Sequence, residues 1–287
     1  MKWTRGYRSN NVDDRRGERG SAAGLGGAGA AGLLFMLFRR FGIVGVLVGG
    51  AALYFLSGGF GSGGSALSGQ RDTTVNDPNE QPTVEFVSFV LDDAQNTWND
   101  LFKAQGKQYQ PARLQIFRTS ISSACGLGQS AMGPFYCPSD QKVYIDLSFY
   151  DELKQRFGAP GDFAQAYVIT HEIGHHVQHL LGLDKNVRSD RAGADSAAVR
   201  LELQADCFSG VWGHSSNERQ LLEAGDLDEA LKAAAVIGDD ALQKQSGGGV
   251  RPESFTHGTS AQRARWFKRG FESGDMASCD TFGAASL

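Results

Sequence analysis

Apolar residues recur at helical or strand spacing throughout residues 83–287, and these patterns predict the elements of a folded domain. Apolar side chains three to four residues apart predict a helix over 83–106, and residues 112–121 read as a strand. From Val143 to Tyr150, apolar and polar residues alternate strictly. This alternation predicts a second strand with one buried face.

Helical patterns dominate the second half of the chain. Asp162-x-x-Gln165 is a plausible capping box for a helix that runs to about Leu181, with Gly182 as its stop. Further helices are predicted over 196–213, from Asp226 onward and over 262–270, with loops at 183–194 and 246–249. Because the strands precede the helices rather than alternating with them, the predicted fold class is α+β.

An apolar segment precedes this domain. Residues 41–60 contain no charged residue, and twenty helical residues span about 30 Å, the thickness of a bilayer's hydrocarbon core. We predict a transmembrane helix at 36–57, a basic, Gly-rich cytoplasmic segment at 1–35, a flexible linker at 58–82 and a catalytic domain at 83–287. Eight Lys and Arg residues lie within residues 1–40, before the uncharged stretch, which places the N-terminus in the cytoplasm and the domain in the periplasm or outside the cell. The alternative is a cleaved signal peptide, but its apolar region would be too long and too far from the N-terminus.

Composition and charge support this division. The chain contains 38 glycines, and 18 of them fall within residues 1–69. The net charge of −4 divides into +5 for residues 1–57 and −9 for the rest. An acidic folded domain argues against nucleic acid as a partner.

All four cysteines follow the apolar segment. An even number of cysteines in an exported domain predicts two disulfides, and four cysteines allow three pairings. Cys125 and Cys137 are twelve residues apart and flank a turn-like segment. We therefore favour the pairs Cys125–Cys137 and Cys207–Cys279 over four free thiols.

The sequence His171-Glu172-Ile173-Gly174-His175 carries the clearest chemistry. On a helix, residues four apart lie on one face, so both imidazoles can reach one zinc ion. Glu172 is then placed to take a proton from a zinc-activated water. The alternative is a helix with surface His and Glu residues. His175 and His179 are also four residues apart and offer a rival ligand pair, but no acid stands between them in the base position. His176 and His179 are therefore expected to be structural or surface groups.

A catalytic zinc needs a third protein ligand, and a second motif supplies one. Glu202 lies 27 residues past His175, in a predicted helix, and Asp206 is four residues further on. Glu202 can bind the zinc, while Asp206 can accept the N–H of a ligand histidine and set its tautomer. The alternative is a solvated acidic face.

Several longer strings make a family resemblance specific. They are 11–17 (NVDDRRG), 133–138 (GPFYCP), 143–149 (VYIDLSF), 171–178 (HEIGHHVQ), 202–207 (ELQADC) and 255–258 (FTHG). With them the chain resembles the bacterial neutral zinc metallopeptidases, which are single-pass membrane proteins. The resemblance implies a zincin-like domain with a small antiparallel sheet and active-site helices, one zinc ion, and hydrolysis of peptide bonds. It also implies His171, His175 and Glu202 as ligands and Glu172 as base.

Two further site predictions concern substrate binding. The 120–137 stretch is expected to form a sheet edge beside strand 143–150 and to pair with an extended peptide. His257 is the favoured donor to the developing oxyanion, ahead of Tyr136 and His214.

The expected function is that of an endopeptidase acting on peptides or proteins, in preference to an exopeptidase. The competing interpretation is a membrane-anchored binding or scaffold protein whose zinc is structural.

Overall fold

The computed structural model describes residues 1–17, 79–187, 192–247 and 249–287, which belong to one compact unit. The predicted transmembrane helix at 36–57 and most of the predicted linker lie outside these residues. Among the described residues, no helix combines the length and the apolar character needed to cross a bilayer.

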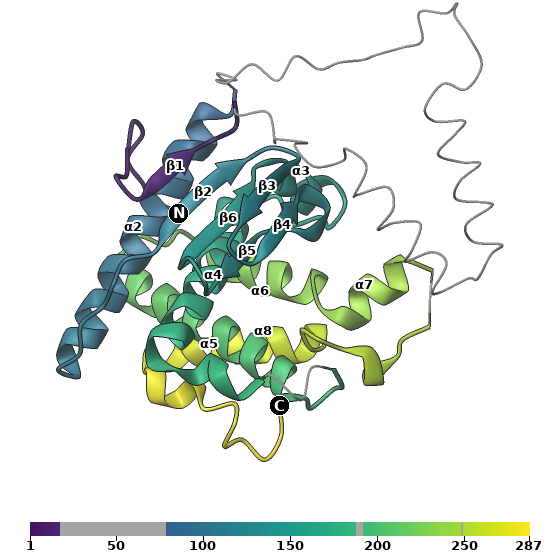
Figure 1. The fold of residues 1–287 in the computed structure, drawn as a ribbon. Coiled ribbons are helices and arrows are strands. Elements are labelled where there is room, and N and C mark those ends of the chain that lie inside the picture. Colours follow the sequence, from purple (N-terminus) through teal and green to yellow (C-terminus); the bar gives the residue numbers. More distant parts are fainter. Residues whose placement is uncertain (18–78, 188–191, 248) are drawn as a thin grey trace, which may run out of the picture. The chain divides into compact units, whose positions relative to one another are not determined.

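A mixed four-stranded sheet forms one side of this unit (Figure 1). Its strand order is β1 (Val12–Asp14), β2 (Arg113–Phe117), β6 (Lys142–Asp146) and β5 (Phe135–Cys137). The β1–β2 and β2–β6 pairs are parallel, and only β5–β6 is antiparallel. The prediction of an antiparallel sheet was therefore wrong. Parallel neighbours need a long connection between them, and many residues separate β1 from β2 and β2 from β6. Strands β5 and β6 are joined by only four residues and are antiparallel.

Both predicted strands end earlier than their patterns suggest. Residues 112–121 divide at Thr119, whose φ is +66°, into β2 and the first strand of a hairpin. That hairpin pairs β3 (Ser120–Ser123) with β4 (Gly126–Gln129). The strand predicted over 143–150 ends at Asp146, where the Asp146 carboxylate accepts the Ser148 N–H at 2.9 Å. Helix α3 (Ser148–Gln155) begins there.

Strand β6 is buried on both faces, which corrects the predicted half-exposed strand. Val143 and Ile145 belong to the main core, whereas Tyr144 packs in a second cluster that includes Phe117 and Cys137. The alternation of apolar and polar residues therefore distinguishes two buried environments rather than a buried and a solvated one.

Residues 1–17 were predicted to lie apart from the folded domain, and the structure corrects this. Strand β1 pairs with β2, and the buried Arg16 bonds the carboxylates of Asp14 at 2.7 Å and Glu80 at 2.6 Å. The amine of the buried Met1 lies 2.8 Å from Asp162 Oδ1. The Met1 amine and Arg16 each pair with a carboxylate outside residues 1–17, so this segment is part of the fold.

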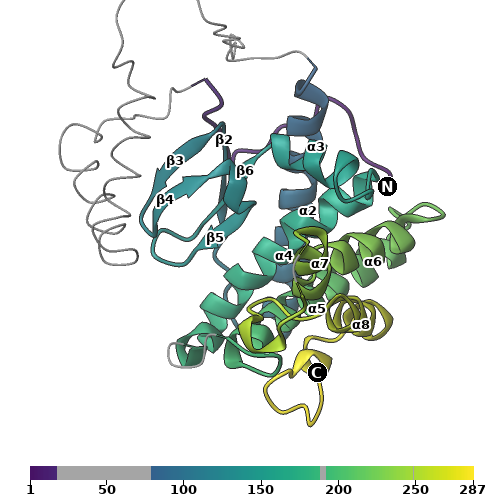
Figure 2. The same cartoon turned by 90° about the vertical axis from the view of Figure 1, so that its right-hand side faces the viewer.

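The helices pack around α4 (Asp162–Leu181), which lies between the sheet and helices α5 and α6 (Figures 1 and 2). The others are α2 (Gln81–Ala104), α5 (Ala197–Glu218), α6 (Asp226–Val236), α7 (Asp239–Gln245) and α8 (Ser260–Ser273). Short 3₁₀ turns occupy Ser130–Met132, Leu183–Val187, Pro252–Ser254 and Met276–Cys279.

The predicted boundaries of α4 are confirmed, but its predicted cap is not. The helix ends at Leu181, and Gly182 adopts the left-handed conformation with φ +73°. At the other end, the N-cap is Gly161, and the Asp162 side chain bonds the Met1 amine instead of capping the helix.

Both predicted disulfides are present. Cys125–Cys137 ties the β3–β4 hairpin to the edge strand β5. Cys207–Cys279 joins α5 to the C-terminal segment.

Candidate metal and peptidase site

Three predicted site residues converge between α4 and α5. His171 and His175 lie one turn apart on α4 and direct their Nε2 atoms at the Glu202 carboxylate of α5, at 3.1 Å and 3.4 Å. One ligand atom from each of the three lies within 4.8 Å of the other two. Two imidazole nitrogens and a carboxylate oxygen are a donor set that zinc accepts, and they leave a fourth position open. The residues present therefore fit a zinc ion.

Gly174 allows the two helices to approach closely. A Cβ atom at this position would lie 2.9 Å from the Ala205 carbonyl oxygen, closer than ordinary van der Waals contact. Glycine at this position of the motif thus lets α4 pack against α5 and brings Glu202 within reach of both histidines.

A buried network holds His171. Its Nδ1 lies 2.8 Å from Asp206 Oδ1, and Asp206 is fully buried. Arg263 of α8 donates to Asp206 through Nε at 2.9 Å, and the Tyr167 hydroxyl donates at 2.5 Å. Burial acts to raise the pKa of Asp206, but the Arg263 and His171 charges outweigh it and lower that pKa. An ionised Asp206 accepts Nδ1–H, so in the neutral form that binds a metal ion the lone pair of His171 is on Nε2, the nitrogen that faces Glu202.

The carboxylates of Glu202 and Asp206 favour positive charge in the space between His171, His175 and Glu202. Burial lowers the pKa of His171, yet Asp206 and Glu202 together raise it to about 10. Burial is likewise outweighed by Glu202 at His175, whose pKa is also raised. The pKa of Glu202 falls well below its ordinary value, because the neighbouring histidines outweigh its burial.

The three converging residues line a cavity of about 570 Å³, and Glu172 lines it as well. Glu172 is 7% exposed and lies on α4, directly after His171. Part of the wall is apolar, formed by Met132, Phe149, Phe157, Val168, Ile237 and Leu242. Another part is the 133–136 segment, which leads into β5. The stretch predicted as a sheet edge, residues 120–137, therefore forms two separate features. Strand β5 is the edge strand of the four-stranded sheet, and β3 and β4 form a hairpin of their own.

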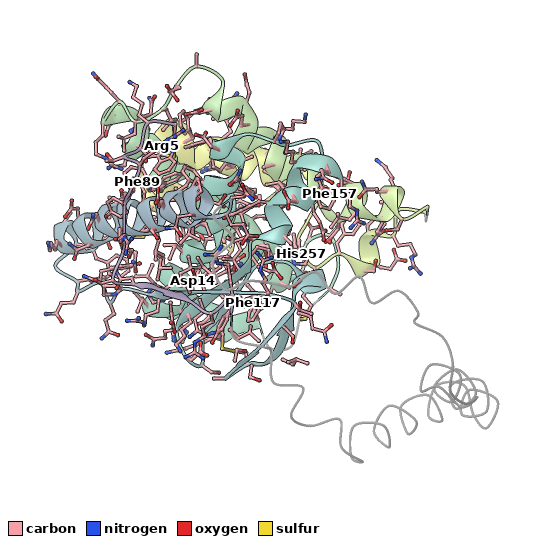
Figure 3. All side chains as sticks on the ribbon, turned by 90° about the horizontal axis from the view of Figure 1, so that it is seen from above. Arg5, Asp14, Phe89, Phe117, Phe157 and His257 are labelled. Atoms are coloured by element: carbon pink, nitrogen blue, oxygen red, sulfur yellow. A yellow bond between two sulfur atoms is a disulfide. The ribbon has the colours of Figure 1, made fainter. Side chains whose placement is uncertain are left out.

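His257, the favoured oxyanion donor, lies in the same cavity, on the loop before α8; it is labelled with Phe157 in Figure 3. Its side chain is half exposed. Asp239 holds the loop, since its Oδ2 accepts the main-chain N–H groups of Thr256 and His257 at 2.7 Å each. His257 Nδ1 lies 3.3 Å from Asp239 Oδ1, and the Glu202 charge raises the pKa of His257.

The alternative oxyanion donors are placed differently. Tyr136 lines the cavity, but its hydroxyl lies 3.0 Å from His176 Nδ1. His176 Nε2 lies 2.6 Å from the Gln110 carbonyl oxygen, which can only accept. His176 therefore donates through Nε2, and its Nδ1 takes the one proton that Tyr136 can donate. His214 bonds the Phe271 carbonyl oxygen at 2.7 Å and does not line this cavity.

The two extra histidines of α4 have structural contacts, as expected. His176 is buried, and burial lowers its pKa to about 4. His179 Nδ1 pairs with Asp184 at 2.7 Å.

Sequence reasoning missed Arg263, Tyr167, Gln178 and Asp239. Arg263 could have been suspected, because it shares the buried face of α8 with Trp266 and Phe267, where a cation needs a partner. Tyr167 precedes His171 by one helical turn. Nothing in the sequence near Gln178 or Asp239 distinguishes either from ordinary polar residues.

Similar proteins show the family of this chain. The model of the family described as "Putative neutral zinc metallopeptidase" matches residues 1–282. The "Uncharacterized protein YpfJ" of Escherichia coli K12 is 56% identical over 225 residues, 77% of this chain and 78% of that protein. The "Uncharacterized protein Rv2575" of Mycobacterium tuberculosis H37Rv is 42% identical over 190 residues, 62% of this chain and 65% of that protein. No solved structure matches this chain significantly. By its sequence and by the residues that converge on α4 and α5, the chain belongs to the neutral zinc metallopeptidase family.

Proposed function

We propose that this protein is a zinc-dependent endopeptidase with a zincin-like site. His171, His175 and Glu202 would hold one zinc ion. The observation that carries the proposal is their convergence within 4.8 Å at the cavity that contains Glu172. Bound there, zinc would polarise a peptide carbonyl and lower the pKa of a water molecule toward about 7.

The chain's own residues would complete the reaction. Glu172 takes a proton from the attacking water as that water's oxygen bonds to the carbonyl carbon, and Glu172 then passes the proton to the departing amine. His257, held by Asp239, is the proposed donor to the carbonyl oxygen, because the single proton of Tyr136 is directed to His176. Asp206 and Arg263 keep His171 in the required tautomer.

The proposed substrate is an extended peptide lying along β5. This strand bonds to β6 on one side only, and the adjoining residues 133–136 line the cavity. A peptide backbone can therefore add to the sheet beside the proposed zinc site.

Two observations weigh against a binding or scaffold protein with a structural zinc. A structural zinc usually has four protein ligands, whereas three of the residues that the structure describes converge here. Glu172 also has no purpose beside a closed site. We further propose that the folded unit works outside the cytoplasm, which its two disulfides favour, and that the apolar 36–57 segment attaches it to a membrane.

The experiment is cleavage of a peptide library by the full chain loaded with zinc, read by mass spectrometry. The full chain is needed because residues 1–17 contribute a strand to the fold. Glu172→Gln is the matched control, since it keeps size and removes the base. Cleavage by the unaltered chain alone supports the proposal. Equal inactivity of both chains, with zinc shown to be bound, contradicts it.

A further inference from the structure

A chain of buried side-chain amides leads from His175 to the C-terminal segment. His175 Nδ1 lies 2.8 Å from Gln178 Oε1, three residues further along α4. Gln178 Nε2 donates to the Leu201 carbonyl oxygen at 2.7 Å and to Gln204 Oε1 at 3.1 Å. Gln204 Nε2 donates in turn to the Cys279 carbonyl oxygen at 3.0 Å. None of these contacts belongs to the Asp206 network that holds His171.

The acceptors in this chain determine how each amide is oriented. The Cys279 carbonyl oxygen can only accept, so Gln204 presents Nε2 to it and Oε1 to Gln178. Gln178 then faces two acceptors, Gln204 Oε1 and the Leu201 carbonyl oxygen, and its Nε2 has two protons for them. Its Oε1 is left facing His175. In the neutral form that binds a metal ion, His175 therefore carries its proton on Nδ1 and has its lone pair on Nε2, the nitrogen that faces Glu202.

The far end of the chain is anchored firmly. A disulfide joins Cys279 to Cys207 of α5, and Cys207 lies three residues after Gln204 on that helix. Thr281 Oγ1 donates to the Arg200 carbonyl oxygen at 2.7 Å, and Arg200 bonds the Ala284 carbonyl oxygen at 3.1 Å. Both glutamines are buried, Gln178 fully and Gln204 to within 5% exposure. A buried amide with all its bonds satisfied has one favoured orientation.

We propose that Gln178 is the positioning residue for His175, and that Gln204 and the disulfide-held main chain at Cys279 set the orientation of Gln178. The inference rests on the proposed zinc site. His171 is held by a charged carboxylate, and His175 is held by a neutral amide connected to the C-terminal segment. Loss of a hydrogen-bond partner of a metal-binding histidine typically weakens metal binding about 10–100-fold.

The test measures zinc affinity by competition with a chromogenic chelator, using full-length chains. Gln178→Met removes the acceptor for His175 Nδ1 at similar volume, and we expect zinc binding about 10–100-fold weaker. Gln115→Met is the matched control, because Gln115 is also buried but bonds Asp13 in the sheet. The control should lower stability and leave zinc affinity unchanged. The visible spectrum of the cobalt-substituted protein should change for Gln178→Met and not for the control.

A second variant separates positioning from a general loss of stability. Gln178→Glu restores an oxygen acceptor for His175, yet it turns a carboxylate toward the Leu201 and Gln204 oxygens. If Gln178 positions His175, the glutamate variant is less stable than the methionine variant but binds zinc more tightly. The inference is overturned if Gln178→Met binds zinc within about twofold of the unaltered chain, or if affinity falls in the same order as stability. Failure of the unaltered chain to bind zinc would overturn the proposed site itself, and this inference with it.

Discussion

Replacing Asp206 with asparagine tests whether a buried ion pair holds the proposed site together. The Asp206 carboxylate is fully buried and bonds Arg263 Nε at 2.9 Å, a second Arg263 nitrogen at 3.0 Å and His171 Nδ1 at 2.8 Å. Arg263 is itself only 3% exposed. Asparagine can still accept from His171 through Oδ1, but its amide nitrogen would then face the donors of Arg263. The substitution leaves the guanidinium buried with its main counter-charge removed.

The size of the effect follows from this burial. Removing one partner of a buried ion pair costs about 3–5 kcal/mol, because the remaining charge has neither water nor a counter-ion. The control is Glu272→Gln on α8, whose pair with Lys268 spans 3.6 Å between side chains that are 65% and 57% exposed. Exposed pairs of this spacing contribute about 0.5 kcal/mol or less.

Urea unfolding of the metal-free chain measures both variants. We expect Asp206→Asn to lower the free energy of unfolding by about 3–5 kcal/mol and Glu272→Gln to leave it almost unchanged. Zinc affinity of Asp206→Asn should fall as well, since the acceptor of His171 loses its charge. A loss below about 1 kcal/mol for Asp206→Asn, comparable with the control, would refute the view that Arg263 depends on this carboxylate.

Three further changes probe the surroundings of the site. Gly270→Ala places a Cβ atom 1.9 Å from the Cys207 carbonyl oxygen, so α8 must move away from α5. We expect the free energy of unfolding, measured by thermal unfolding, to fall by about 1–3 kcal/mol. Gly213→Ala should lower it less, because the nearest atom to its Cβ is a Phe271 side-chain carbon at 3.0 Å. His257→Asn should lower kcat by about 10²–10³-fold with unchanged zinc content, and an unchanged kcat would remove His257 from the reaction. Replacing Cys207 and Cys279 with serine removes a disulfide that spans 72 residues, and chain entropy predicts a loss of about 4 kcal/mol in the free energy of unfolding. The substitution should also weaken zinc binding. Zinc binding equal to that of the unaltered chain would contradict the coupling of this disulfide to the site.

The metal-facing residues were the most predictable part of the site because their geometry is local. Two histidines four residues apart must share a helix face, and Gly182 marks the end of that helix. Glu202 and Asp206 follow the same logic on α5. Their convergence with α4 depends on the close helix approach at Gly174, which the spacing alone does not reveal.

The parts that escaped prediction depend on contacts between distant residues. Arg263 and Asp206 are 57 residues apart, and the Gln204 contact with Cys279 joins positions 75 apart. Strand β1 contains only three residues, of sequence VDD, and has no apolar periodicity. It is a strand because β2 offers it a partner about 100 residues later. No local pattern encodes such a pairing.

The pairing of β1 with β2 limits how the chain can be arranged about a membrane. Strands that share hydrogen bonds must lie in one compartment, so Gly17 and Asn79 are on the same side of any bilayer. A cytoplasmic N-terminus and an exported domain, as predicted from the distribution of basic residues, cannot both occur in this folded state. Residues 1–17 therefore lie in the same compartment as the site between α4 and α5.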